Sequence, residues 1–140
     1  MQVIIFKNDD AGVSVIYPTP ESLQLHTIEE VALKDVPAGV EAEIVEISEV
    51  LSDRTFRGAW EKNGKAIVHN LTKAKDIAHK KRREARSKEF APLDVEATIP
   101  SRASQAEAAR QAIRNKYAAM QEQMDGATTI EELKALLPQE

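Results

Sequence analysis

The sequence of 140 residues contains no cysteine, few aromatic residues and no long apolar run. The absence of cysteine excludes disulfide bonds, thiolate metal sites and cysteine nucleophiles, and it is consistent with a reducing compartment. No run approaches the roughly 18 apolar residues of a membrane-spanning helix, so we expect a soluble protein with no membrane partner. The apolar start, residues 1–7, is too short for a signal peptide and is followed by the polar residues 8–10.

Aromatic residues make up only 4% of the chain, although hydrophobic residues reach 42%. Much of the apolar share is alanine, which buries little surface, so the sequence predicts a thin, helix-rich core. A protein with a thin core is commonly stabilised by contacts with other subunits. We therefore expect self-association as a dimer or trimer, through the long helices.

The sequence also lacks a recognisable catalytic or ligand-binding constellation. The three histidines, His26, His69 and His79, are widely separated, whereas a zinc site needs three or four converging ligands. The five glycines are scattered and build no phosphate-binding loop. No carboxylate spacing marks an acid–base pair. We expect no catalytic residue, no metal, no cofactor and no enzymatic activity.

The net charge of −4 is unevenly distributed along the chain. Residues 1–70 hold 6 Lys/Arg against 12 Asp/Glu, while residues 71–100 hold 8 against 5. A basic middle beside an acidic front favours head-to-tail contacts within or between chains. It argues against a dedicated nucleic-acid-binding protein, which would normally be basic overall.

Strand patterns dominate the first half. Residues 2–7 and 13–17 are rich in β-forming residues and are separated by Asn-Asp-Asp-Ala-Gly. The Gly and Asx residues of this segment tolerate positive φ. The pattern therefore predicts a hairpin with a five-residue loop. Pro18 and Pro20 are expected to end the second strand. Residues 42–48 predict a third strand that joins this hairpin. The pair Asn63-Gly64 predicts a type I′ turn with positive φ at both residues.

Helix signals dominate the second half. Thr27 and Glu30 form a capping box for a short helix in the first half, and Thr128-Thr-Ile-Glu-Glu132 predicts a similar start near the end. Between these two short helices the sequence predicts two long ones. Pro92 is expected to disturb or end the first, which is basic. Ser101 or Ser104 is expected to cap the second, and Gly126 to end it. The expected helices span about residues 27–34, 71–89, 102–125 and 128–137. The second long helix carries an apolar stripe at Ala103, Ala106, Ala109, Ala112, Ile113, Tyr117, Met120 and Met124.

These patterns predict an α+β fold in two parts. Residues 1–70 form a small antiparallel β-rich domain, and residues 71–140 form a long helical hairpin with a short C-terminal helix.

The most distinctive stretch is Ser-Asp-Arg-Thr-Phe-Arg-Gly-Ala-Trp at residues 52–60, which contains the only tryptophan. Ser52 or Asp53 is expected to cap a short turn that buries Phe56 and Trp60 where the sheet meets the helices. The same turn would leave its two arginines free to meet a partner.

A basic cluster at residues 79–88 is the second candidate site. Consecutive helical residues are about 100° apart, so the cluster circles the helix and some of its side chains must pack against protein. Three alternatives stay open: a solvated helix with ion pairs to Glu84 and Glu89, contact with an acidic protein surface, or nucleic-acid binding. The lack of aromatic side chains for base stacking opposes the last. The expected partner-binding residues are Arg54, Arg57, Lys80, Lys81, Arg82, Arg83 and Arg86.

Residues 52–60, followed by a hairpin and by Lys73-Ala-Lys-Asp-Ile77, resemble small tailed-bacteriophage and prophage proteins of the tail-assembly-chaperone or tail-fibre-associated type. Arg82–Arg86, Leu93-Asp94, Ala109–Arg114 and Ala127–Ala135 are similar to later segments of that family, so the resemblance covers about residues 40–137. It implies a non-enzymatic phage protein that binds another tail or virion component, in the bacterial host cytoplasm or in the virion. The alternative is a phage-encoded inhibitor that binds a host defence protein or sequesters a small charged ligand.

Overall fold

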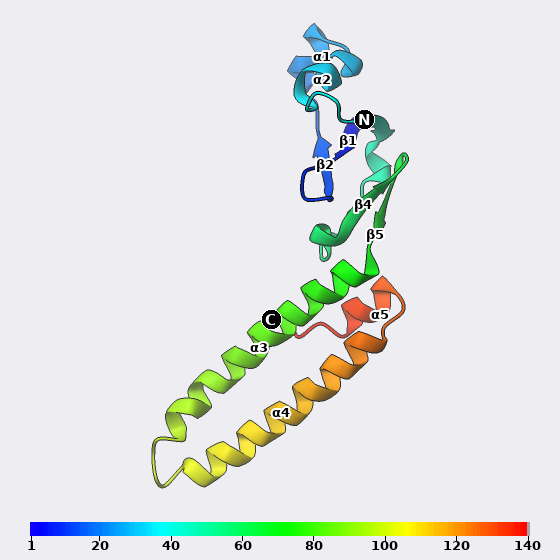
Figure 1. The fold of residues 1–140 in the computed structure, drawn as a ribbon. Coiled ribbons are helices and arrows are strands. Elements are labelled where there is room, and N and C mark those ends of the chain that lie inside the picture. The colour runs from blue at the N-terminus through cyan, green and yellow to red at the C-terminus, as the bar shows by residue number, and fades with distance from the viewer. Residues whose placement is uncertain (140) are drawn as a thin grey trace. The chain divides into compact units, whose positions relative to one another are not determined.

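The computed structural model describes residues 1–139, and the chain divides into two compact units, residues 1–70 and a second unit that begins at Leu71 (Figure 1). The first unit contains a small antiparallel sheet and the second contains two long helices packed together. The predicted α+β fold is therefore confirmed.

The sheet of the first unit has three strands in the order β2-β1-β3. The strands are β1 (Gln2–Lys7), β2 (Val13–Ile16) and β3 (Ala42–Glu46), and both pairings are antiparallel. The predicted hairpin and its third strand are thus confirmed, although β3 ends earlier than expected, at a 3₁₀ turn η1 (Ile47–Glu49). The central strand β1 is buried on both faces at its four middle residues.

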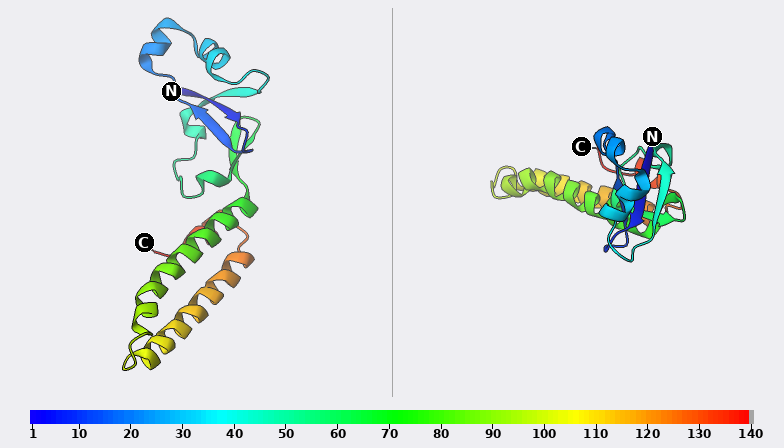
Figure 2. Two further views of the ribbon diagram at one scale, coloured as in Figure 1. Left: turned by 60° about the vertical axis from the view of Figure 1, so that its left-hand side comes forward. Right: turned by 90° about the horizontal axis from the view of Figure 1, so that it is seen from above.

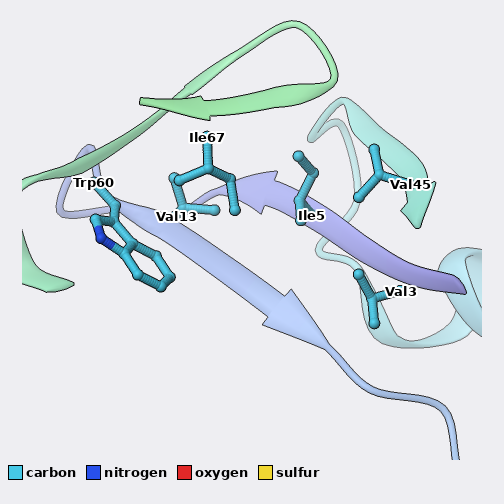
Figure 3. Packing of buried hydrophobic residues seen from close by; sticks show 6 residues of the cluster. All are labelled: Val3, Ile5, Val13, Val45, Trp60 and Ile67. Atoms are coloured by element: carbon cyan, nitrogen blue, oxygen red, sulfur yellow. The ribbon is translucent and has the colours of Figure 1, made fainter. Parts of the chain in front are cut away.

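Each face of the sheet is covered by a different element of the same unit. One face packs against a hairpin of β4 (Trp60–Asn63) and β5 (Ala66–His69), which follow the 3₁₀ turn η2 (Arg57–Ala59). The other face packs against α2 (Ile28–Asp35). Figure 3 shows the side chains of the hairpin-side core, which are Val3, Ile5, Val13, Val45, Trp60 and Ile67. Trp60 and Phe56 are buried, as predicted, and Trp60 belongs to this strand core.

Positive φ angles occur at different residues from those expected. In the β1–β2 loop the residue with positive φ is Ala11, at 63°, while Asn8 Oδ1 accepts the backbone N–H groups of Asp10 and Gly12. In the β4–β5 hairpin the positive φ is at Gly64 alone, and Asn63 belongs to β4 opposite Ala66. The predicted type I′ turn is therefore wrong. Glycine at the first of the two loop positions is the pattern of a type II′ turn.

Two short helices connect β2 to β3. The capping box of α2 is confirmed, since Thr27 Oγ1 accepts the N–H of Glu30 and Glu30 accepts the N–H of Thr27, each at 3.2 Å. The preceding helix α1 (Pro20–Leu25) was not expected. Pro20 was assigned only to ending the strand, but proline at the first helical position follows a Thr19 cap without cost.

The second unit consists of α3 (Leu71–Glu96), α4 (Ala103–Gly126) and α5 (Ile130–Ala135), with α3 and α4 side by side (Figures 1 and 2). The predicted end of α3 near residue 89 is wrong, because the helix continues through Pro92. Proline removes one backbone hydrogen bond, to the carbonyl of Lys88. Both residues are exposed, so water is available to that carbonyl.

The ends of α4 also differ from expectation. Neither Ser101 nor Ser104 caps it: the N-cap is Arg102, without a side-chain hydrogen bond. Gly126 is its last residue, and Ala127 is the C-cap in an extended conformation. The cap of α5 lies at Thr129, whose hydroxyl accepts the N–H of Glu132. The apolar stripe packs inside the hairpin at its buried positions, Ala106, Tyr117 and Met124, whereas Ala112 is exposed.

Candidate functional site

The segment at residues 52–60 forms a compact turn, stabilised first by Asp53. Its Oδ1 accepts the backbone N–H of Thr55 at 3.0 Å and the Thr55 hydroxyl at 2.6 Å. The N–H of Arg57 then bonds to the Arg54 carbonyl at 3.1 Å. The predicted cap at Asp53 is confirmed, and the turn places both arginines near the indole of Trp60.

Arg57 is part of the first unit's own packing. Its guanidinium carbon lies 4.4 Å from the Trp60 ring centroid, and its Nη2 donates to the Val13 carbonyl at 2.6 Å. Burial is the main cause that lowers the pKa of Arg57, and the positive charge of Arg54 adds to it. The expectation that the turn leaves Arg57 free is therefore wrong, because a cation–π contact and a hydrogen bond to a strand occupy its guanidinium.

Arg54 is more accessible. Its side chain is exposed, its Nη2 donates to the Tyr17 hydroxyl at 3.2 Å, and its guanidinium carbon lies 5.8 Å from the Trp60 centroid. One arginine of the motif is thus largely structural and the other remains at the surface. Partner binding at either residue stays a prediction.

In α3, the basic cluster does circle the helix, and Arg82 is the residue that points into the protein. Its exposed fraction is only 8%, and burial is the main cause that lowers its pKa, followed by the charges of Arg83 and Arg86. The expectation that part of the cluster packs against protein is confirmed at this residue. Because Arg82 is buried in the chain itself, it offers little surface to a partner.

Arg82 belongs to a chain of contacts that ties the start of α3 to the end of α4. Its Nε donates to His79 Nδ1 at 3.3 Å, so Nδ1 is the acceptor and Nε2 carries the hydrogen that faces Asp125 Oδ1 at 2.8 Å. Lys75 Nζ donates to the Asp125 backbone carbonyl at 2.8 Å. Cations are favourable here, because the last carbonyls of a helix carry partial negative charge.

Further along the hairpin, Glu89 pairs with α4. Lys116 Nζ donates to Glu89 Oε1 at 2.9 Å, and this hydrogen bond is the main cause that lowers the pKa of Glu89. The ion pair expected between Glu89 and the basic cluster is therefore replaced by one across the hairpin. Arg86 has another partner, since its guanidinium carbon lies 4.8 Å from the Phe90 ring centroid. No pattern in the sequence identifies Lys116 as the partner of Glu89, since the two are far apart along the chain.

Three of the expected partner-binding residues in the cluster remain available. Lys80 and Arg83 are exposed and Lys81 is half-buried. The first two are three residues apart, so they are neighbours on one helical face. The part of the chain that the structure describes holds none of the three in an ion pair. This exposed basic face of α3, defined by Lys80, Lys81 and Arg83, is the best candidate site among the predicted residues.

A groove that the sequence did not predict lies beside this face. It has a volume of about 560 Å³ and is formed where Leu137 and Pro138, after α5, lie near α3. Lys81, Lys88 and Tyr117 also line it. No local signal could have found it, because the path of the chain after α5 depends on tertiary packing.

Among residues 1–139, no group of three or more histidines and carboxylates could hold a metal ion. No helix in this range has the length and apolarity needed to cross a membrane. Comparison of the chain with known protein families, curated proteins and solved structures finds no match.

Proposed function

We propose that this chain is a non-enzymatic bacteriophage protein that binds another tail or virion component through the exposed basic face of α3. The observation that carries this proposal is the contrast within one cluster. Arg82 and Arg86 are engaged by His79 and Phe90, while Lys80, Lys81 and Arg83 have no such partner among the described residues. The motif at residues 52–60 supplies the phage assignment.

The partner that suits this face is an acidic protein surface. Exposed ion pairs each contribute only about 0–1 kcal/mol, so three cations give modest affinity. Such cations do increase the association rate, and charge complementarity at the rim of an interface also contributes to specificity. Such binding fits a component that meets its partner during assembly in the bacterial host cytoplasm or stays with it in the particle.

The test compares two double variants with the same change in charge. Lys80→Glu/Arg83→Glu reverses the exposed face of α3, and Lys34→Glu/Arg102→Glu reverses two exposed cations elsewhere. Purified tail and virion proteins of the cognate phage are titrated against both variants and the wild type. We expect the first variant to lose binding and the second to keep it. Equal binding by both variants would overturn the proposed surface, and absence of the chain from purified virions would restrict its role to assembly.

Nucleic acid is tested in parallel with random duplex DNA. About three phosphate contacts would give a log–log salt slope of roughly −3. We expect no micromolar binding at physiological salt. Micromolar binding that the Lys80→Glu/Arg83→Glu variant abolishes would place the chain among nucleic-acid-binding proteins instead.

The groove at Lys81 and Lys88 favours a second candidate, an inhibitor that binds a host defence protein or sequesters a small charged ligand. Both side chains line a concave surface next to the phenol of Tyr117, together with the carboxylates of Glu84 and Glu89. Native mass spectrometry of the protein purified from infected cells separates the two candidates. A small charged ligand that is retained by the wild type and lost in Lys81→Glu/Lys88→Glu would favour the inhibitor.

A further inference from the structure

Asn63 differs from the other three asparagines of the chain because its side-chain amide is free. The side chain is exposed, and its amide makes no hydrogen bond among the described residues. Asn8, by contrast, uses both its amide oxygen and its amide nitrogen in hydrogen bonds. Asn70 donates to Glu61 Oε1 at 2.8 Å, and Asn115 accepts a side-chain hydrogen bond within α4 at 3.0 Å. The fold therefore leaves one asparagine whose amide can turn without breaking a contact.

The residue after Asn63 is a glycine at the first position of the β4–β5 loop. Gly64 is exposed with φ at 61°, and its N–H donates no hydrogen bond in the part of the chain that the structure describes. A Cβ placed on Gly64 would meet no atom within 4 Å. Glycine itself has no Cβ to shield its backbone nitrogen. The nitrogen of Gly64 and the side-chain carbonyl carbon of Asn63 are thus neighbours along the chain at a site open to solvent.

An asparagine amide and the next backbone N–H can react without an enzyme, which is one reason why asparagine is thermolabile. The Gly64 nitrogen loses its proton to hydroxide and forms a bond to Asn63 Cγ. The bond from Cγ to Nδ2 breaks, ammonia leaves, and a five-membered succinimide ring remains. Water then opens this ring at either of its two carbonyls. One product is aspartate, and the other is isoaspartate, in which the main chain runs through Cβ and Cγ.

The closed hairpin opposes this ring closure. Asn63 is the last residue of β4 and pairs with Ala66 at the start of β5. In an extended strand, the Cβ of a residue and the next backbone nitrogen lie far from the eclipsed arrangement that the five-membered ring requires. The ring can therefore close only after Asn63 has left the ladder. Exposed turns open locally at a low cost in free energy, so the tip of the hairpin controls the rate.

From this geometry we infer that Asn63 is a site of spontaneous covalent modification, converted by water to isoaspartate and aspartate when the β4–β5 hairpin opens. Isoaspartate adds one carbon to the main chain at the closing pair of the hairpin, which shifts the next pair, Lys62 with Ile67. Ile67 belongs to the buried core that also contains Trp60. The modification therefore lowers the stability of the first unit as the protein ages. This inference is independent of the proposed role of α3, because it concerns the other unit.

The first experiment ages the full-length protein at neutral pH and follows all four asparagines by peptide mass spectrometry. The fragmentation method is one that separates isoaspartate from aspartate. We expect Asn63 to account for nearly all of the converted asparagine, with isoaspartate among its products. Asn63→Gln is the matched control, because its longer side chain would need a six-membered ring, and it should stay unmodified. Comparable conversion at all four asparagines, or conversion of Asn63 to aspartate alone, would overturn the inference.

A second experiment tests whether opening of the hairpin controls the reaction. Trp60→Ala removes a core side chain at the other end of β4, and denaturing urea opens the wild-type hairpin without a substitution. We expect conversion of Asn63 to be at least about tenfold faster in both cases, because the rate follows the population of the open form. Asn115, in the other unit, should convert at the same rate in Trp60→Ala as in the wild type. A rate at Asn63 that urea leaves unchanged would show that the closed turn already permits ring closure.

A third experiment measures what the modification does to the fold. Asn63→Asp, freshly purified, has the same new charge as the isoaspartate form but a normal main chain. The two proteins are compared by hydrogen exchange at Val68, which pairs with Glu61 in a hydrogen-bonded position of the ladder. We expect the isoaspartate form to lose protection there and Asn63→Asp to keep it. Equal protection in the two proteins, whether kept or lost, would overturn the inferred effect of the added backbone carbon.

Discussion

Replacement of Trp60 by alanine tests the central element of the first unit. The side chain is fully buried and packs with Val13, Ile67 and other aliphatic side chains of the sheet and hairpin. Truncation of a buried tryptophan typically costs about 3–5 kcal/mol, through lost transfer free energy and the cavity that remains. At about 0.05–0.15 kcal/mol per residue, a unit of 70 residues has a total stability of roughly 3.5–10 kcal/mol. The variant should therefore leave residues 1–70 marginally folded or unfolded.

Hydrogen exchange resolves the effect by unit. We expect the amides of β1 to lose most of their protection in Trp60→Ala, while the amides of α4, in the other unit, keep theirs. Loss of protection in both would show that the units fold together. Wild-type protection in β1 would refute the reasoning, because a core position could not be emptied at no cost.

Trp60→Phe is the matched control. It keeps an aromatic ring in the cavity but removes the indole N–H, which is buried and has no hydrogen-bond partner among the described residues. An unsatisfied buried donor costs about 1–3 kcal/mol, so its removal should offset part of the lost packing. The destabilisation should be clearly smaller than for alanine. A cost equal to that of alanine would mean that the contact with Arg57 or a water-mediated bond of the indole is the dominant contribution.

Two further predictions concern the helical unit. We expect sedimentation equilibrium at high micromolar concentration to show a dimer or trimer, formed through the long helices. A monomer would mean that packing within the single chain, which buries Tyr117 and Met124, is enough to cover the apolar stripe. Because the folded pKa of Glu89 is lowered, mainly by Lys116, its stabilising contribution should be present above the usual glutamate range and disappear as pH falls through the folded pKa. The carboxylate is partly exposed, so its contribution to the free energy of unfolding should not exceed about 1 kcal/mol. Urea titrations between about pH 3 and 7 check this: the free energies of unfolding of the wild type and Glu89→Gln should converge at the acid end.

Part of the local hydrogen-bond chemistry was predictable from the sequence, although the serine caps of α4 and the type I′ turn were not correct. The Thr27–Glu30 capping box forms both of its bonds, because the spacing alone brings each side chain to the other residue's N–H. The three-stranded sheet was predictable because apolar runs and polar turns alternate over short distances. The capping box and the β1–β2 hairpin depend on residues close in sequence, for which sequence and geometry are closely coupled, whereas the β1–β3 pairing joins residues as far apart as Gln2 and Glu46.

Proline was less informative than expected. Pro20 starts α1 and Pro92 lies inside α3, although both were assigned to ending elements. The cost of an internal proline is limited when the freed carbonyl can reach water, and the sequence does not show which face of a helix is solvated. The exposure of Lys88 and Pro92 is a tertiary property.

The roles of the arginines were unpredictable for the same reason. Arg54 and Arg57 occur in one short motif, and Arg82 and Arg83 are adjacent, yet in each pair one side chain packs into the protein more deeply than the other. Periodicity shows that a basic cluster circles a helix, but not which direction faces the neighbouring helix. Substitution of Arg82 would therefore confound loss of binding with loss of packing, whereas Lys80 and Arg83 allow a clean test.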